Sequence, residues 1–224
     1  MSKVGCCTPT SNDCACLLNF TVRDTFNLMN GKDIIVFDLE TKKEFAEIGG
    51  RDRADLLGVS VLGAYSYNHD KYFVFEEHEL PDFEKMLANT GLLVGYNIKH
   101  FDIPVLQPYI SFPLSKIEYL DLIFDATSGA GFRPKLDNLA RTTLGVAKSA
   151  DGLQALRWYR EGKIQEIKDY CLQDVKVTRG LYEFGQKNGF VKLISREAMG
   201  EITVAVKWGL PRVLAAEYVQ GALL

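Results

Sequence analysis

Four acidic side chains and one tyrosine stand at positions where a charged or polar group requires a chemical reason. Asp38 and Glu40 close a run of apolar residues, and their i, i+2 spacing places both side chains on one face of a strand. Asp102 lies between two large apolar residues, and Asp174 falls on an apolar helical stripe one turn after Tyr170. Carboxylates drawn from separate segments are the ligands that Mg²⁺ or Mn²⁺ prefers, so the set predicts a site for a hard divalent cation.

Each acid also has an ordinary structural interpretation when it is taken alone. The pair at Asp38 and Glu40 is typical of a solvated strand end, and Asp102 is typical of a cap or a first helical turn. Asp174 is open to a hydrogen bond from Tyr170 at i−4. Because an isolated carboxylate on a core-facing stripe is costly to bury, Asp174 needs a partner more strongly than the other three acids.

Other catalytic classes lack their motifs in this chain. The three histidines, His69, His78 and His100, are scattered and form no HExxH pattern, which disfavours a zinc hydrolase. No GxSxG segment indicates a nucleophilic serine, and no GxxxxGK[ST] segment indicates an ATPase or kinase.

Hydrophobic periodicity predicts the elements that position these residues. Five strands are expected at 34–37, 56–67, 71–75, 92–96 and 117–122. Helices are expected from Pro81, at 103–109, 136–144, 152–161 and 163–187, with a loop at 128–131 and a terminal hairpin within 190–208. The order predicts an α/β fold: a mixed five-stranded sheet, with an antiparallel meander of the first three strands followed by parallel strands, and helices on both faces.

Composition restricts the class of protein further. The chain has 224 residues, of which 47% are hydrophobic and 25% charged, as expected for one globular domain with appendages. Its 26 Lys and Arg against 29 Asp and Glu give a net charge of −3, so a nucleic acid would have to bind in a local groove. No apolar run reaches the ~18 residues of a membrane span, so we expect a soluble, cytoplasmic protein with no membrane partner.

The domain organisation predicted from these patterns has three parts. Residues 1–28 form an N-terminal extension, 29–189 the core, and 190–224 a C-terminal hairpin and tail. Four of the five cysteines crowd the extension, at Cys6, Cys7, Cys14 and Cys16. Their spacing is not a disulfide framework and does not repeat the CxxC pairs of zinc sites, which leaves zinc binding and incidental thiols as the two interpretations.

In order and spacing, the acidic set resembles the DEDD 3'-5' exonucleases of the ribonuclease-H-like superfamily, tyrosine (DEDDy) subgroup. FDLET at 37–41 resembles the first motif, and 95–106 resembles the second motif of family-B polymerase proofreading domains. YCLQD at 170–174 resembles the third motif, YxxxD, whereas the histidine of the other subgroup is replaced by Asp169. Over about residues 30–188 the chain is also similar to exonuclease domains found alone or beside helicases.

This resemblance implies a ribonuclease-H-like fold and a metal-dependent 3'-5' exonuclease that releases 5'-mononucleotides from the 3' ends of single-stranded DNA or RNA. It implies two divalent cations, Mg²⁺ or Mn²⁺: Asp38, Glu40 and Asp174 hold one, while Asp38 and the scissile phosphate hold the second. Asp102 acts largely through water, and Tyr170 orients the attacking water. Since the reference pKa of tyrosine is about 10, Tyr170 is a poor base by itself.

The same resemblance implies that Asn97 and Phe101 seat the terminal nucleotide, although core packing explains Phe101 equally well. Lys135 begins a further family-like segment, KLDNLA, and is a candidate phosphate contact, together with Lys99, Arg133 and Arg141. The basic and aromatic run at 157–163 suits either a single strand or a solvated helix face. The expected partners are single-stranded nucleic acid and a helicase or polymerase. The alternative is a catalytically weak module that binds nucleic acid or tethers such an enzyme.

Overall fold

The computed structural model describes residues 32–146 and 152–208. The predicted N-terminal extension with its cysteine cluster, and the tail from 211 onward, lie outside the described residues. Among the helices of the described part, none combines the length and the apolar character needed to cross a bilayer.

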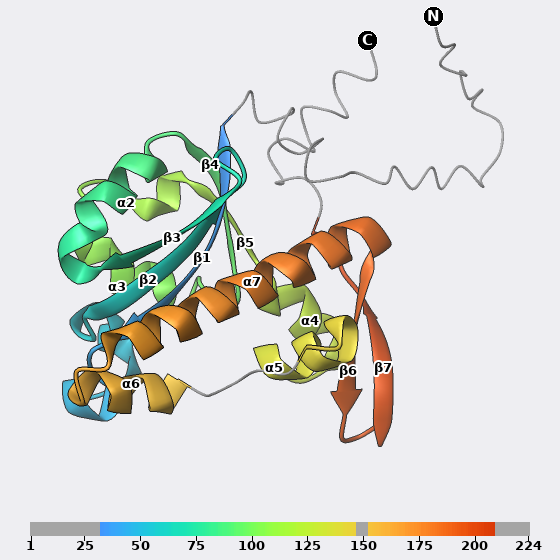
Figure 1. The fold of residues 1–224 in the computed structure, drawn as a ribbon. Helices are drawn as coiled ribbons and strands as arrows, with labels where there is room; N and C mark the ends of the chain where they lie inside the picture. The colour runs from blue at the N-terminus through green and yellow to red at the C-terminus, as the bar shows by residue number, and fades with distance from the viewer. Residues whose placement is uncertain (1–31, 147–151, 209–224) are drawn as a thin grey trace, which may run out of the picture.

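A mixed five-stranded sheet with the strand order β3-β2-β1-β4-β5 forms the centre of the fold (Figure 1). The antiparallel part consists of β1 (Asp33–Thr41), β2 (Val59–Ser66) and β3 (Lys71–Glu76). On the other side of β1, β4 (Thr90–Gly95) and β5 (Glu118–Asp121) run parallel to it. The predicted meander followed by parallel strands is therefore confirmed.

Helices cover both faces of this sheet, as the sequence predicted. They are α2 (Leu80–Leu87), α3 (Asp102–Leu106), α4 (Ile123–Ala130), α5 (Leu136–Leu139), α6 (Gly152–Arg160) and α7 (Ile164–Asn188). Short 3₁₀ turns lie at Phe45–Ile48, Arg51–Leu56, Glu77–Glu79, Gln107–Tyr109 and Leu114–Lys116, and a π turn at Ala140–Leu144 continues α5. Figure 1 shows α7 crossing one face, with α2 and α3 on the other.

Several boundaries differ from the sequence prediction: β1, expected at 34–37, continues to Thr41, and the helix expected at 103–109 ends at Leu106. Two further differences concern α4 and β2. The expected loop at 128–131 is instead the last turn of α4, which ends at Gly131 with a φ of 76°. Gly129 is glycine because of a close approach: a Cβ there would lie 2.3 Å from Cγ1 of Val204 in the terminal hairpin. The second strand starts at Val59 because Arg51–Leu56 forms a 3₁₀ turn.

Successive side chains of β1 point to opposite faces of the sheet, so the strand contributes to the hydrophobic core on both faces. Ile35, Phe37 and Leu39 pack with the residues of α2 and α3. Ile34 and Val36 pack on the opposite face, with residues of α7. The next two residues on this second face are Asp38 and Glu40, because side chains two apart in a strand point the same way. The strand therefore changes from apolar to acidic under α7.

A glycine opposite Asp38 sets how closely α7 approaches the sheet. Gly63 of β2 is the register partner of Asp38. A Cβ at Gly63 would lie 3.1 Å from both Cys171 Sγ and Val175 Cγ2 of α7. Because Gly63 has no side chain, α7 can pack directly against the backbone of β2. This close packing brings Asp174 next to β1.

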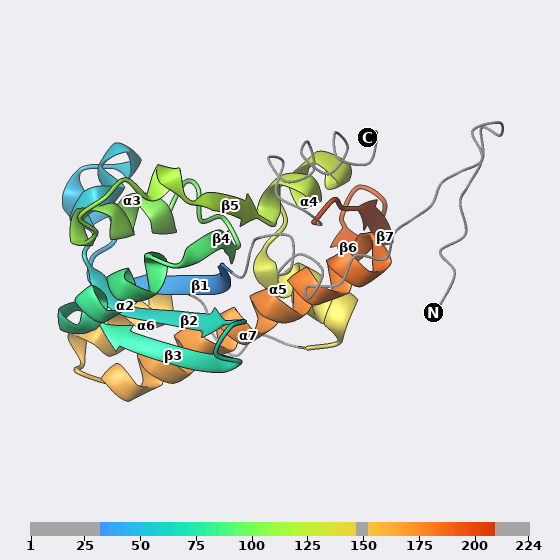
Figure 2. The ribbon, with the colours of Figure 1, turned by 90° about the horizontal axis from the view of Figure 1, so that it is seen from above.

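The predicted terminal hairpin is confirmed as β6 (Phe190–Ser195) and β7 (Gly200–Ala205). Seen from above in Figure 2, the hairpin lies at the C-terminal end of α7, beside α4. Val191, Leu193 and Val204 belong to the same hydrophobic cluster as the α7 face of the sheet. The hairpin thus shares its core with the α/β unit.

We predict that Gly63→Val moves α7 away from β1. The added branched side chain would collide with Cys171 and Val175, which costs about 1–3 kcal/mol of stability in an overpacked core. Thermal unfolding should show a lower Tm for this variant, and Mn²⁺ should stabilise it less than the wild type. Gly63→Ala is the graded control, with a smaller effect in both measurements. Equal Mn²⁺ stabilisation in all three proteins would contradict this account of Gly63.

Candidate active site

A cavity of about 500 Å³ opens near the carboxyl end of β1. Eight residues predicted from the sequence line it: Asp38, Glu40, Asn97, Phe101, Asp102, Lys135, Tyr170 and Asp174. They come from one strand, the loop and helix that follow β4, the segment before α5, and α7. The structure therefore brings these eight residues together, whereas the other candidate phosphate contacts, Lys99, Arg133 and Arg141, are not among the residues that line the cavity.

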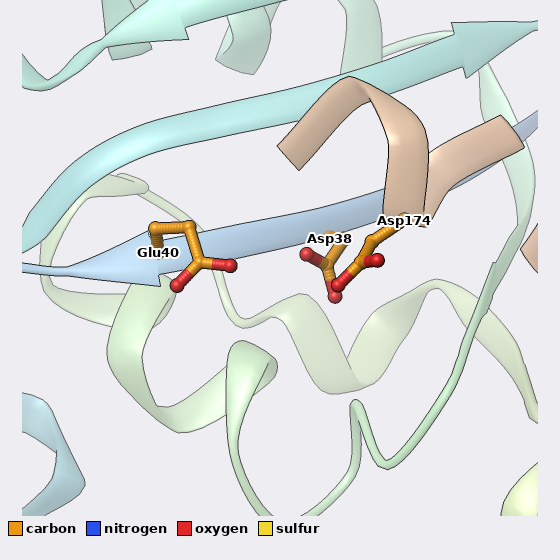
Figure 3. A group of neighbouring side chains, drawn as sticks. All are labelled: Asp38, Glu40 and Asp174. Atoms are coloured by element: carbon orange, nitrogen blue, oxygen red, sulfur yellow. The ribbon is translucent and has the colours of Figure 1, made fainter. Parts of the chain in front are cut away.

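Three of these carboxylates form a compact cluster. One oxygen from each of Asp38, Glu40 and Asp174 lies within 4.8 Å of the others. Figure 3 shows Asp38 and Asp174 side by side, with Glu40 beside them on β1. Glu40 and Asp174 are buried, while Asp38 is half-buried. Like charges held this closely require a cation or a proton to offset them.

The donor set fits a hard divalent cation. Its atoms are all carboxylate oxygens, which suit Mg²⁺, Mn²⁺ or Ca²⁺. The neighbouring Cys171 is buried and donates its S–H to the backbone carbonyl of Asp38 at 3.3 Å. Burial, and then the charges of Asp38, Glu40 and Asp174, raise the pKa of this thiol, so it stays protonated and is no thiolate ligand.

Asp102 connects the second predicted motif to the first. It is the first residue of α3, as predicted, and its Oδ1 accepts a hydrogen bond from the backbone N–H of Leu39 at 3.1 Å. This N–H belongs to the part of β1 beyond Val36, where pairing with β4 has ended. The carboxylate thus takes the place of a neighbouring strand for this backbone group, and Asp102 reaches the cavity beside the cluster.

The pKa of Asp102 differs strongly from its ordinary value. This pKa is raised from 3.8 to about 8, chiefly by burial and in addition by the charges of Asp121 and Asp174, while the hydrogen bond from the Leu39 N–H opposes the rise. Asp102 is 2% exposed, so water does little to stabilise a charge on its carboxyl group. A proton or a bound cation is therefore needed to neutralise this side of the cavity at neutral pH.

Tyr170 lies one helical turn before Asp174 and faces the same cavity. Burial, then the charges of Asp174, Glu40 and Asp38, raise its pKa, and its hydroxyl donates a hydrogen bond to Asp174. The ring of Trp158 packs against it edge to face at 6.1 Å. The hydrogen bond considered as a structural alternative is thus present, together with the acidic cluster. A hydroxyl held protonated in this way can orient a water molecule but cannot deprotonate it.

The loop after β4 is held by an acid that the sequence analysis did not select. Asp121, the last residue of β5, is buried and accepts backbone hydrogen bonds from Asn97 at 2.6 Å, Lys99 at 3.0 Å and Ile123 at 3.3 Å. Asn97 has a φ of 70°, a conformation that asparagine tolerates better than most residues. Asp121 lies at the end of a predicted strand, as Asp38 does, and this position in the sequence could have identified it.

The remaining predicted side chains form the walls of the cavity. Phe101 packs edge to face against Phe45 at 5.9 Å, and both rings line the cavity. Phe101 also packs against the core of the α2 face, so the cavity and core interpretations both hold. The side chain of Asn97 accepts a hydrogen bond from Arg133. Lys135 lines the cavity together with Lys43.

Other basic residues that were candidates for phosphate contacts form ion pairs with neighbouring carboxylates. Arg141 forms an ion pair with Asp137 at 3.1 Å. In the run at 157–163, Arg160 forms ion pairs with Glu44 and Glu47, at 3.3 and 3.1 Å. These contacts support the interpretation of that run as a solvated helix face rather than as a nucleic-acid contact.

Comparison with known proteins identifies the family to which this chain belongs. The model of the RNase_H superfamily matches residues 35–185, and the chain belongs to that superfamily. The family B DNA polymerase from the hyperthermophilic archaeon Pyrobaculum calidifontis is a similar solved structure, with a TM-score of 0.53 and 20% sequence identity. The match covers 69% of this chain and 24% of the polymerase, so the chain corresponds to a minor part of that protein. No curated protein matches the chain. The superfamily and the acidic cluster together indicate a nuclease.

The raised pKa of Asp102 predicts an unusual pH dependence of stability in EDTA. Between pH 3.8 and about 8 the folded protein keeps a proton that the unfolded chain loses, so stability falls as pH rises through this window. For one group the slope reaches about 1.4 kcal/mol per pH unit. Asp102→Asn should flatten the dependence, because its amide carbonyl still accepts the Leu39 N–H without titrating. Denaturant unfolding at several pH values measures both slopes, and parallel slopes would contradict the assignment.

Proposed function

We propose that this protein is a metal-dependent 3'-5' exonuclease that removes 5'-mononucleotides from single-stranded DNA or RNA. The observation that carries the proposal is the meeting of Asp38, Glu40 and Asp174 within 4.8 Å, on two elements that are distant in sequence. The tyrosine one turn before Asp174 on α7 supports the DEDDy subgroup within the superfamily. The similar fold of the family B DNA polymerase is consistent with the proposal. The 3'-5' direction is inferred from the second motif of this chain, which resembles that of family-B proofreading domains.

The acidic residues would act by holding divalent cations at the scissile phosphate. Asp38, Glu40 and Asp174 would hold one cation, and Asp38 would share a second with the substrate, while Asp102 would contribute through water. Two such cations lower the pKa of a bound water and offset the charge that develops on the transferred phosphoryl group. Four carboxylates repel a phosphodiester by themselves, so substrate binding and cation binding should depend on each other.

Tyr170 would fix the direction from which water attacks. Its hydroxyl donates to Asp174, and burial raises its pKa above the ordinary value, so its role would be orientation. Asn97 and Phe101 would seat the terminal nucleotide, with Arg133 holding the Asn97 side chain. Lys135 would offset phosphate charge at the mouth of the cavity. The apolar wall at Phe45, Phe101 and Leu57 offers a surface for a base or a sugar.

The proposal predicts the behaviour of Asp174→Asn against a matched control. Loss of a cation ligand should lower kcat/KM for mononucleotide release by about a thousandfold, because charge stabilisation worth several kcal/mol is lost. Asp169→Asn removes an exposed carboxylate from the same helix and should retain wild-type activity. The measurement is release of label from 3'-labelled and 5'-labelled single strands of DNA and RNA with Mg²⁺, Mn²⁺ or EDTA.

Three other outcomes of this assay would contradict the proposed function, each in a different way. Full activity of Asp174→Asn, or full activity in EDTA, would refute the metal-dependent mechanism. Cleavage of circular strands would show an endonuclease instead of an exonuclease. Nucleic-acid binding without release of any nucleotide would favour the tethering module that works with a helicase or polymerase.

A second prediction separates orientation of water from structural support. Tyr170→Phe should lower kcat by about ten- to a hundredfold and leave KM and Mn²⁺ affinity close to wild type, because only the water loses a partner. Tyr182→Phe, also a buried tyrosine of α7, is the matched control and should retain kcat. A large loss of Mn²⁺ affinity in Tyr170→Phe would instead make Tyr170 a structural residue.

A further inference from the structure

A second surface with nucleic-acid-binding chemistry lies next to the cavity. The parallel strands β4 and β5 end at Gly95 and Asp121, which are register partners, so the segments that follow them leave the sheet together. The carboxyl ends of parallel strands meet at one edge of a sheet, and β1 carries Asp38 and Glu40 toward this same edge. The segments that follow β4 and β5 therefore begin at the same edge of the sheet as the cavity.

The surface consists of Phe124, Lys99 and His100, and we call it the Phe124 surface. Phe124, in the first turn of α4, remains 40% exposed although it is a large aromatic residue. The Lys99 ammonium lies 5.4 Å from the centre of its ring. The His100 ring meets the Phe124 ring edge to face, with the centres 6.0 Å apart. Both Lys99 and His100 are exposed.

The two basic side chains are available for an anionic partner. Within 32–146 and 152–208, Lys99 forms no ion pair with a carboxylate, whereas Lys42, Arg160 and Lys168 do. His100 forms no ion pair there either, but it lies near enough to the buried Asp121 carboxylate for its charge to act on the pKa of that group. The acid next in sequence to the ring, Asp125, is directed to the hairpin, where its Oδ2 accepts the backbone N–H of Lys207 at 2.7 Å.

The surface is rigidly connected to the cavity. The buried Asp121 carboxylate accepts the backbone N–H of Lys99 and that of Ile123, and so fixes the lysine beside the first turn of α4. The same carboxylate accepts the N–H of Asn97, whose side chain lines the cavity. One loop therefore presents Asn97 to the cavity and Lys99 to the outer surface.

We propose that the Phe124 surface is an accessory binding site for the single-stranded nucleic acid, beyond the nucleotide that enters the cavity. A base stacks on the exposed part of the Phe124 ring, and Lys99 and His100 contact the phosphates on either side. Aromatic rings interleaved with cations are the usual means of binding a single strand without sequence preference. The proposal rests on the proposed function, because it assigns the path of the same substrate.

The test is a binding measurement that does not depend on hydrolysis. A fluorescent single strand of about 15 nucleotides, longer than the cavity can hold, is titrated with protein and followed by anisotropy. The titration is done in EDTA, where the metal-free cavity repels phosphate and the measured affinity reports the Phe124 surface. Phe124→Leu keeps an apolar side chain in α4 but removes the stacking ring, and Lys99→Ala removes the cation. We expect each to weaken binding about tenfold, as for the loss of one stacked base or one phosphate contact. Lys99→Ala should also lower the slope of log affinity against log salt by about one unit.

Lys71→Ala is the matched control. Lys71 is exposed and lies 5.2 Å above the Phe73 ring, the same kind of contact, but at the opposite end of the sheet, where β3 begins. Its variant should bind the strand like the wild type. Circular dichroism and Tm of each variant show whether it is folded.

The outcomes separate this proposal from the proposed function. Wild-type affinity in both Phe124→Leu and Lys99→Ala would overturn the accessory site and leave the exonuclease proposal intact. Weakened binding in these two variants, with no release of nucleotide by the wild type, would support the site and overturn the exonuclease. A wild-type protein that neither binds the strand nor releases nucleotide would overturn both.

Discussion

Repulsion among closely placed carboxylates is the constraint on which the arrangement of this protein depends. Asp38, Glu40 and Asp174 meet within 4.8 Å, two of them buried, and Asp102 adds a fourth acid in the same cavity. Such a cluster lowers the stability of the metal-free fold unless protons or cations offset its charge. The rest of the domain must therefore supply the stability that the site removes. It does so with hydrophobic clusters on both faces of the sheet.

Hydrogen bonds from buried acids to the backbone hold the site in place. Asp102 accepts the N–H of Leu39 at the point where β1 has lost its neighbour β4, and Asp121 accepts three N–H groups around the following loop. Gly95 allows this loop to turn closely, since a Cβ there would lie 2.2 Å from Ile98 and 3.0 Å from the Phe37 carbonyl. Most of these hydrogen bonds join segments that are distant in sequence. The shape of the cavity therefore depends on tertiary contacts and not on local structure.

Much of this arrangement could be predicted from the sequence because it follows from periodicity. The i, i+2 spacing of Asp38 and Glu40 fixed their common face, and the helical stripe through Asp174 fixed its direction. The prediction failed at 128–131 because a glycine that permits the packing of Val204 looks the same in sequence as a glycine that permits a turn. Asp121 was missed because its role is to accept backbone N–H groups of a loop whose conformation no local pattern reveals. The exonuclease direction and the cation number stay predictions.

The central claim is that β1 and α7 together form one binding site for divalent cations, and Mn²⁺ binding tests it most directly. Electron paramagnetic resonance of free Mn²⁺, titrated into wild-type protein, Asp174→Asn and the control Asp169→Asn, counts bound ions without any substrate. We predict saturable binding to the wild type and the control, and a loss of affinity of at least about tenfold in Asp174→Asn. Equal Mn²⁺ binding by wild type and Asp174→Asn, or no binding by the wild type, would contradict the claim.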